Sequence, residues 1–211
     1  AAVAHVHVRD EEGNDSMKVE TFKKVIDLVH EIIRTAISFQ PDSAGGIANS
    51  EEARMAPFKT LKPEMASFDC GTMKLDAYGY FQQQSKFFEK YGYSYAGSRG
   101  LNLKLKSLYP GMIHDAAYYL KTGYLKAPLH FQFCMGCAGG ISATIDDLVF
   151  MKQTLERVVP GSTWSAFGVG KGAMEIMYAA IAAGGNIRVG MEDNVVYKKG
   201  QLAESNMQLI A

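Results

Sequence analysis

The sequence predicts an α/β fold built on a parallel sheet, and two observations lead to this prediction. Seven short apolar runs of strand length alternate with segments that have the apolar spacing of helices. Glycine or proline punctuates most of the joins, as at Pro41, Pro128 and Gly161. Strands that alternate with helices form βαβ units, whose strands run parallel. Because no nucleotide-binding glycine pattern follows the first strand, a TIM (β/α)8 barrel suits the chain better than an open doubly wound sheet.

The expected elements follow one another along the whole chain. Their apolar runs predict strands at residues 2–8, 35–39, 64–68, 101–108, 129–134, 162–166 and 186–191. Helical spacing predicts helices at residues 19–33, 80–91, 113–120, 145–158 and 172–183, with a last helix beginning near residue 202. Seven strands are one short of an eight-stranded barrel, and the chain begins inside a strand without a methionine. We therefore expect a single barrel domain over residues 1–211 that lacks its first βα unit.

Composition disfavours several classes of function. The 22 lysines and arginines balance the 22 aspartates and glutamates without a basic run, which argues against nucleic acid or an anionic membrane as partner. The apolar runs are short, so we expect neither a membrane span nor a secretory leader. Three cysteines, an odd number, argue against a disulfide framework and predict a cytoplasmic protein. The C-x-x-C pattern of Cys134 and Cys137 can mark a redox or zinc site, but we interpret it as two buried structural thiols.

Two histidines near the start of the chain are the first candidate ligands. His5 and His7 alternate with apolar residues in the first expected strand, and a strand points every second residue to the same face. Neutral imidazoles are common ligands of Zn²⁺ and similar ions. The alternative is a pair of histidines that hydrogen bond to the backbone on a half-exposed strand.

The last expected strand carries charges that packing does not explain. Arg188, Gly190 and Glu192 share a face by the period of two, and Asp193 follows at the strand end. Buried unpaired charges are costly, so a run of this kind is either a solvated loop or a functional cluster. As a cluster, it supplies Glu192 as an oxygen ligand beside the two histidines, Asp193 as a free carboxylate and Arg188 as an anion clamp. Two histidines, a glutamate and an open position form a catalytic zinc arrangement.

Two other strand ends are polar. Ser43 and Gly46 belong to a serine–glycine loop whose backbone N–H groups can approach an anion closely, although such a loop is usually only a turn. Ser67 stands near the end of the third expected strand, where a serine is either a neutral filler or a ligand.

Six motifs in this order run along the chain: H-V-H-V-R-D at 5–10, S-A-G-G with E-E-A-R at 43–54, K-P-E-M-A-S at 62–67, G-M-I-H-D-A at 111–116, W-S-A-F-G-V-G at 164–170 and G-G-N-I-R-V-G-M-E-D-N at 184–194. With these motifs the sequence resembles the β-keto acid cleavage enzyme family. The resemblance implies a zinc-dependent TIM barrel and an acyltransferase in which a β-keto acid and acetyl-CoA become acetoacetate and a new acyl-CoA. It also implies a homotetramer with small-molecule partners only.

The resemblance also assigns roles by position. It assigns the metal to His5, His7 and Glu192 and the role of general base to Asp193. It assigns Arg188 to assisting that base and the reacting carbonyl groups. Ser43, Gly46 and Ser67 match positions that hold the carboxylate end of the keto acid.

One position departs from the family. Where the family commonly has a substrate-side glutamate in a P-E-x-E pattern, this chain has Lys104, or Lys106 if the alignment slips. A glutamate suits an aminated substrate, whereas a lysine favours an acyl chain with a second carboxylate or another polar anion. The alternative is a lysine that faces solvent.

Two other functions are consistent with the same fold. A metal-dependent hydrolase of the amidohydrolase type also begins with H-x-H on a barrel strand, but it needs further histidines on later strands. Of the remaining histidines, His30 and His114 fall on expected helices, which leaves only His130 on a strand. A catalytically inactive scaffold of this fold is the non-enzymatic alternative.

Overall fold

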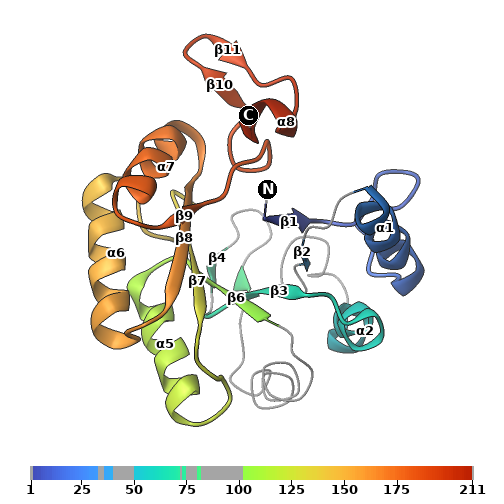
Figure 1. The fold of residues 1–211 in the computed structure, drawn as a ribbon, viewed down its shortest axis with the longest axis horizontal. Helices are drawn as coiled ribbons and strands as arrows, with labels where there is room; N and C mark the ends of the chain where they lie inside the picture. Colours follow the sequence, from blue (N-terminus) through green and yellow to red (C-terminus); the bar gives the residue numbers. More distant parts are fainter. Residues whose placement is uncertain are drawn as a thin grey trace. The chain divides into compact units, whose positions relative to one another are not determined.

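The computed structural model describes residues 2–32, 36–39, 50–71, 73–74, 80–81 and 102–210 (Figure 1). The chain divides into two compact units. The first comprises Ala1–Asp69 and Ser85–Lys104, and the second comprises Cys70–Gln84 and Leu105–Ala211. Strand β6 (Asn102–Ser107) crosses the boundary, so its first half belongs to the first unit and its second half to the second.

The first unit is a run of βα elements with parallel strands. It contains β1 (Val3–Val6), α1 (Val19–Ile32), β2 (Ala36–Phe39), α2 (Glu51–Leu61) and β3 (Met65–Asp69). Parallel pairing joins β1 to β2 with Val3 opposite Ala36, and β2 to β3 with Ser38 opposite Met65. The N–H of Asn102, at the start of β6, donates to the carbonyl of Glu64 over 3.1 Å, which places β6 beside β3.

Capping explains helix α2, which the sequence-based prediction missed. The Ser50 side chain accepts a hydrogen bond from the N–H of Ala53, as an N-cap residue does. At the other end Lys62 adopts φ 50°, and its N–H donates to the carbonyl of Phe58. The left-handed conformation at Lys62, followed by Pro63, ends the helix before β3.

The second unit continues the same alternation. Its main elements are α5 (Pro110–Lys121), β7 (His130–Met135), α6 (Ile145–Val158), β8 (Thr163–Gly168), α7 (Ala173–Ala182) and β9 (Asn186–Ile187), with the strands in the order β6-β7-β8-β9. Strands β7 and β8 pair in parallel over six residues, from His130 opposite Thr163 to Met135 opposite Gly168. Within this unit α5, α6 and α7 lie side by side next to these strands (Figure 1).

Smaller elements complete the second unit. A 3-10 turn, η4 (Gly170–Gly172), precedes α7, and the chain ends in a hairpin of β10 (Val196–Lys198) and β11 (Gln201–Leu202), followed by α8 (Asn206–Ile210). Strands β4 (Met73–Lys74) and β5 (Tyr80–Phe81) form a separate antiparallel pair.

The two faces of strands β7 and β8 differ in chemistry. One face carries the fully buried Phe131 and Phe133 together with Trp164, whose ring stacks on Phe133 with centroids 5.4 Å apart. Gly185, just after α7, lies directly against the Trp164 ring. The other face carries polar side chains, among them Gln132 and Ser165, which lie opposite each other in the register. The apolar face forms the core of this unit, and Phe167 on the polar face contacts Arg188.

The structure confirms the predicted parallel α/β architecture and corrects several boundaries. The strand expected at 186–191 ends at Ile187. The helix expected at 80–91 is wrong at its start, because Tyr80 and Phe81 form β5, and its remainder lies outside the described residues. The last helix begins at Asn206, since Leu202 belongs to β11. Within the described ranges, every helix is too short or too polar to cross a membrane.

Candidate functional site

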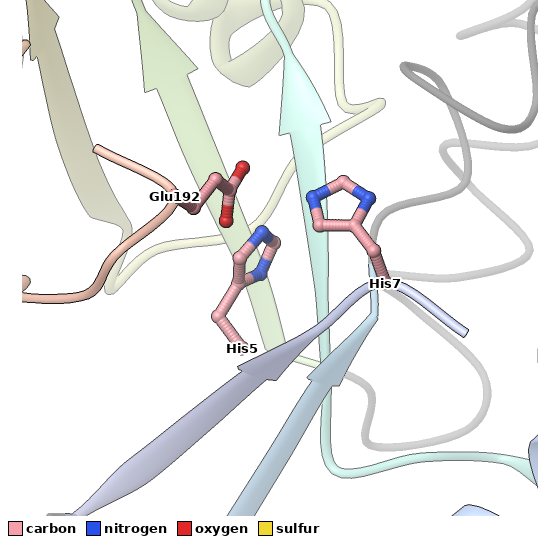
Figure 2. A group of neighbouring side chains, drawn as sticks. All are labelled: His5, His7 and Glu192. Atoms are coloured by element: carbon pink, nitrogen blue, oxygen red, sulfur yellow. The ribbon is translucent and has the colours of Figure 1, made fainter. Parts of the chain in front are cut away.

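The first unit presents the two histidines together. His5 lies in β1, and His7 follows one residue after its end. Both are half-buried, and their ring centroids are 5.0 Å apart with the ring planes nearly perpendicular at 89°. Figure 2 shows the two rings at the end of β1. The alternation of the sequence therefore brings two imidazoles side by side, as expected for residues two apart in extended backbone.

A buried serine and a buried lysine surround His5. The Oγ of Ser67 and the Nζ of Lys104 each lie 3.4 Å from Nδ1 of His5. Ser67 is fully buried and Lys104 is only 4% exposed, so the interpretation of Lys104 as a solvent-facing residue is wrong. Because an ammonium group only donates hydrogen bonds, Nδ1 of His5 is the acceptor in its contact with Lys104.

Asp69 is a buried carboxylate near Ser67 that the sequence analysis did not single out. It is fully buried at the end of β3, two residues after Ser67 and therefore on the same face of the strand. A buried carboxylate is uncommon unless a partner or a function retains it. The sequence could have indicated Asp69 by its position at the carboxyl end of a predicted parallel strand, because functional side chains gather there in α/β folds.

The second unit presents an ion cluster around Arg188. Its guanidinium group donates from Nε to Oδ2 of Asp193 over 2.7 Å and from Nη2 to Oδ1 over 2.9 Å. Nη2 also lies 2.7 Å from Oε2 of Glu192. The side chains of Arg188 and Asp193 are 11% and 8% exposed, whereas that of Glu192 is half-exposed at 52%. The centroid of the Phe167 ring lies 4.5 Å from Cζ of Arg188, which is a cation–π contact.

Backbone hydrogen bonds, rather than a strand, position this cluster. The N–H of Arg188 donates to the carbonyl of Ala166 over 3.2 Å and extends the β8–β9 ladder by one residue. The N–H groups of Asp193 and Asn194 then both donate to the carbonyl of Gly190, which forms a turn. The expectation that Arg188, Gly190 and Glu192 share a strand face is therefore wrong. The turn brings both carboxylates back to the arginine instead.

The loop that follows β8 also hydrogen bonds to this turn. The N–H of Gly170, after β8, donates to the carbonyl of Asp193 over 3.2 Å. Gly170 has φ +66°, a conformation that residues with a side chain rarely adopt. Gly170, two residues after the end of β8, thus holds the backbone of Asp193 in place.

Burial and charge act in opposite directions on the pKa values of Arg188 and Asp193. Burial by itself would lower the pKa of Arg188, but the attraction of Asp193 and Glu192 outweighs it, and the pKa is raised. Burial raises the pKa of Asp193, while Arg188 opposes this shift. Lys106 also acts to lower the pKa of Asp193, so this second lysine of β6 acts electrostatically on the same carboxylate.

Of the remaining residues singled out in the sequence, some lie outside the described residues and others lie within them. Ser43 and Gly46 lie outside the described residues. All three cysteines are free thiols, and Cys134 is buried as expected, whereas Cys137 is only half-buried. His130, on β7, contacts the side chains of Thr163 and Ser165 over 2.9 and 3.1 Å.

Comparison with known proteins identifies the family of this chain. The chain belongs to the beta-keto acid cleavage enzyme family, whose family model matches residues 1–211. The resemblance stated from the sequence is therefore confirmed.

Two curated relatives and one solved structure illustrate the similarity. The 3-keto-5-aminohexanoate cleavage enzyme of Fusobacterium nucleatum subsp. nucleatum is 35% identical over 210 residues, which cover 100% of this chain and 74% of that protein. The 3-oxoadipate:acetyl-CoA acetyltransferase of Cupriavidus necator is 26% identical, over 100% of this chain and 72% of that protein. The apo structure of ObcA superposes with a TM-score of 0.84 at 16% identity, which supports the fold. The alignment covers 100% of this chain but only 56% of the ObcA chain.

Proposed function

We propose that this chain carries the catalytic site of an enzyme that exchanges acyl groups between a β-keto acid and acetyl-CoA. The products are acetoacetate and the acyl-CoA of the remaining chain. We also propose that the parallel strands β1, β2, β3, β6, β7, β8 and β9 belong to one (β/α)8 barrel domain. The observation that carries the proposal is the buried Arg188–Asp193 pair, a fixed carboxylate beside a fixed cation, in a member of this family.

The reaction needs a base, and Asp193 suits that role. A proton between two carbonyl groups is acidic enough for a carboxylate to remove. The resulting carbanion attacks the acetyl thioester and expels the CoA thiolate. The thiolate then attacks the original keto carbon and cleaves its bond to the central carbon, which gives the new acyl-CoA. The proton held by Asp193 returns to that central carbon to give acetoacetate, so atoms and electrons balance.

Arg188 serves both the base and the reacting oxygen atoms. Its Nε and Nη2 hold Asp193, while the buried Nη1 has no hydrogen-bond partner within the described ranges. A guanidinium nitrogen cannot lose its proton in a protein, so Nη1 stays a donor. We infer that it donates to a carbonyl or thioester oxygen on which negative charge develops during the reaction.

We propose His5, His7 and Glu192 as the ligands of one divalent ion (Figure 2). Two imidazoles whose ring centroids are 5.0 Å apart and a half-exposed carboxylate are the donor types of a catalytic zinc site with an open position. When bound, such an ion would act as a Lewis acid on the keto oxygen. Zinc as the particular ion, a cytoplasmic location and a tetrameric assembly stay predictions from the family resemblance.

Lys104 is proposed to select the acyl chain. A buried ammonium group needs an acceptor, and in the structure it contacts Nδ1 of His5. A metal ion at His5 requires either this lone pair or a proton on Nδ1, so the ammonium group then loses this acceptor. A carboxylate at the far end of the substrate is a suitable one. The name of the Cupriavidus necator relative, 3-oxoadipate:acetyl-CoA acetyltransferase, describes a substrate of this dicarboxylic type.

Ser43, Gly46 and Ser67 are proposed to hold the carboxylate next to the keto group. Of these, Ser67 is described, and its hydroxyl is fully buried beside His5. A hydroxyl at this point can donate to an anionic oxygen.

Metal analysis together with an acetyl-CoA-dependent assay tests the proposal. The wild-type protein should contain about one divalent ion per chain and convert at least one β-keto acid with acetyl-CoA into acetoacetate. A His5→Ala/His7→Ala variant should lose both the metal and the activity, because three protein ligands leave no redundancy. His30→Ala is the matched control, since His30 lies on α1 and pairs with Glu64 over 3.1 Å. Stoichiometric metal in the double variant would contradict the proposed site.

A further inference from the structure

The polar face of β7 and β8 continues away from the Arg188 cluster. Gln132 on β7 lies opposite Ser165 on β8, and the two are only 3% and 4% exposed. The preceding pair on the same face is His130 opposite Thr163. Interior positions of parallel strands are usually filled by branched apolar residues, so a buried polar row here needs another explanation.

The hydrogen bonds of this row leave one end of the Gln132 amide unused. Its Nε2 donates to Oγ of Ser165 over 3.4 Å, while the buried Oε1 has no hydrogen-bond partner in the described part of the chain. Ser165 Oγ is already engaged by Nε2 of His130 at 3.1 Å and by the carbonyl of Phe131 at 3.4 Å. Turning the amide over exchanges its oxygen and nitrogen, so one end lacks a partner in either orientation.

Gln132 and Ser165 lie one step along the strands from the candidate catalytic residues. Phe167, whose ring lies against Arg188, follows Ser165 by two residues and so shares its face. Two residues of extended strand span about 6.6 Å. A substrate whose keto group lies at Arg188 and Asp193 would reach Gln132 with an atom about four bonds further along its acyl chain.

We propose that Gln132 is a specificity-determining residue that hydrogen bonds to a neutral polar group on the acyl chain, about four bonds from the keto carbon. A hydroxyl group fits best, because it both donates and accepts and therefore meets either orientation of the amide. The inference rests on the proposed acyl exchange and adds to it the chemical class of the chain. It is separate from the role of Lys104, which concerns charge.

The test compares two substrates that differ only in this group: a straight-chain six-carbon β-keto acid and its analogue with a terminal hydroxyl. In the wild type, kcat/KM should be higher for the hydroxylated acid. Gln132→Leu keeps the volume and removes the hydrogen bonds, so it should lower kcat/KM for the hydroxylated acid by about tenfold or more. The value for the alkyl acid should stay within about twofold of the wild type.

Ser107→Ala is the matched control. Ser107 is fully buried on β6, but on the face opposite Lys104 and Lys106, and its loss should leave the ratio of the two substrates unchanged. If Gln132→Leu does not fold, Gln132→Met carries the same test. An equal effect on both acids would overturn the inference, because it would mean that the amide is satisfied by water or serves only packing. If the wild type converts neither acid, the ratio of the two dissociation constants in each variant decides the role of Gln132, and the proposed acyl exchange fails only if no other β-keto acid is converted.

Discussion

Arg188 donates two parallel hydrogen bonds to the carboxylate of Asp193, from Nε to Oδ2 over 2.7 Å and from Nη2 to Oδ1 over 2.9 Å. This two-point contact fixes the plane of the carboxylate as well as its position. Because both side chains are about nine-tenths buried, the pair is weakly screened by solvent. The chain therefore presents a carboxylate in one orientation, which a base acting on a single C–H bond requires.

Asp193→Asn should keep the fold and bound metal but lose most of the turnover. A neutral amide cannot take the proton, and general-base catalysis contributes about 10²- to 10⁴-fold. We expect a fall in kcat of that size, measured by acetoacetate formation, with metal content and circular dichroism unchanged. Glu192→Gln is the companion variant and should lose metal. A near-native kcat in Asp193→Asn would show that Asp193 is not the general base.

Lys104→Glu should shift the substrate preference toward cationic chains. The side chain is buried, so reversing its charge changes a weakly screened contact worth about a few kcal/mol. We expect kcat/KM to fall for a carboxylated β-keto acid and to rise for an aminated one. Lys59→Glu, an exposed substitution on α2, is the control for net charge. An unchanged ratio between the two substrates would show that Lys104 does not read the acyl chain.

The alternation of strands and helices was predictable because each element carries its own pattern. Helix α6 begins and ends where its apolar spacing predicts, with Thr144 as N-cap. Helix α2 was not predicted, since Pro57 lies inside it and its apolar spacing is weak. Ser50 at its start and Pro63 just after its C-cap were sequence signals for this helix, but the weak apolar pattern hid it.

The candidate site was predictable in its residue types but not in its geometry. Alternation placed His5 and His7 together correctly, because two residues in extended backbone share a face. The same rule failed for Glu192, where a turn closed on the carbonyl of Gly190 replaces the strand. The burial of the other site residues depends on tertiary packing. Nothing local distinguishes the buried Lys104 or Gln132 from exposed polar residues of a strand that also alternates.

Gly185→Ala should destabilise the fold, because the Trp164 ring occupies the space of its side chain. A Cβ at Gly185 would lie 2.5 Å from Cζ3 and 2.6 Å from Cζ2 of that ring, which itself stacks on Phe133. Overpacking of this kind typically costs about 1–3 kcal/mol. Denaturant unfolding measures the loss, and Trp164→Leu in the same background should recover part of it. Additive effects of the two substitutions would show that the clash is relieved elsewhere.

Two neighbouring ionisable side chains near the start of α5, Tyr109 and Asp115, predict a pH-dependent stability. Burial raises the pKa of the Asp115 carboxyl, and His114 only partly opposes this shift. Burial, followed by the nearby Asp115, also raises the pKa of Tyr109. Both side chains approach Gly71, since a Cβ there would lie 3.1 Å from the Tyr109 hydroxyl and 3.3 Å from Oδ2 of Asp115. The environment of Asp115 therefore favours its neutral form.

Asp115→Asn should stabilise the protein at neutral pH and lose this advantage in acid. A carboxyl whose pKa is raised by folding costs stability once it ionises, so the cost is complete above the folded pKa and absent below the unfolded one. We expect Asp115→Asn to have the higher Tm at about pH 7 and the difference to shrink as the pH falls toward about 4, the ordinary range of a carboxyl. Tm measured across this range for both proteins checks the sign. A lower Tm for Asp115→Asn than for the wild type at neutral pH would contradict this prediction, and so would a Tm difference that grows in acid. Either result would mean that an ionic contact stabilises the charged form of Asp115.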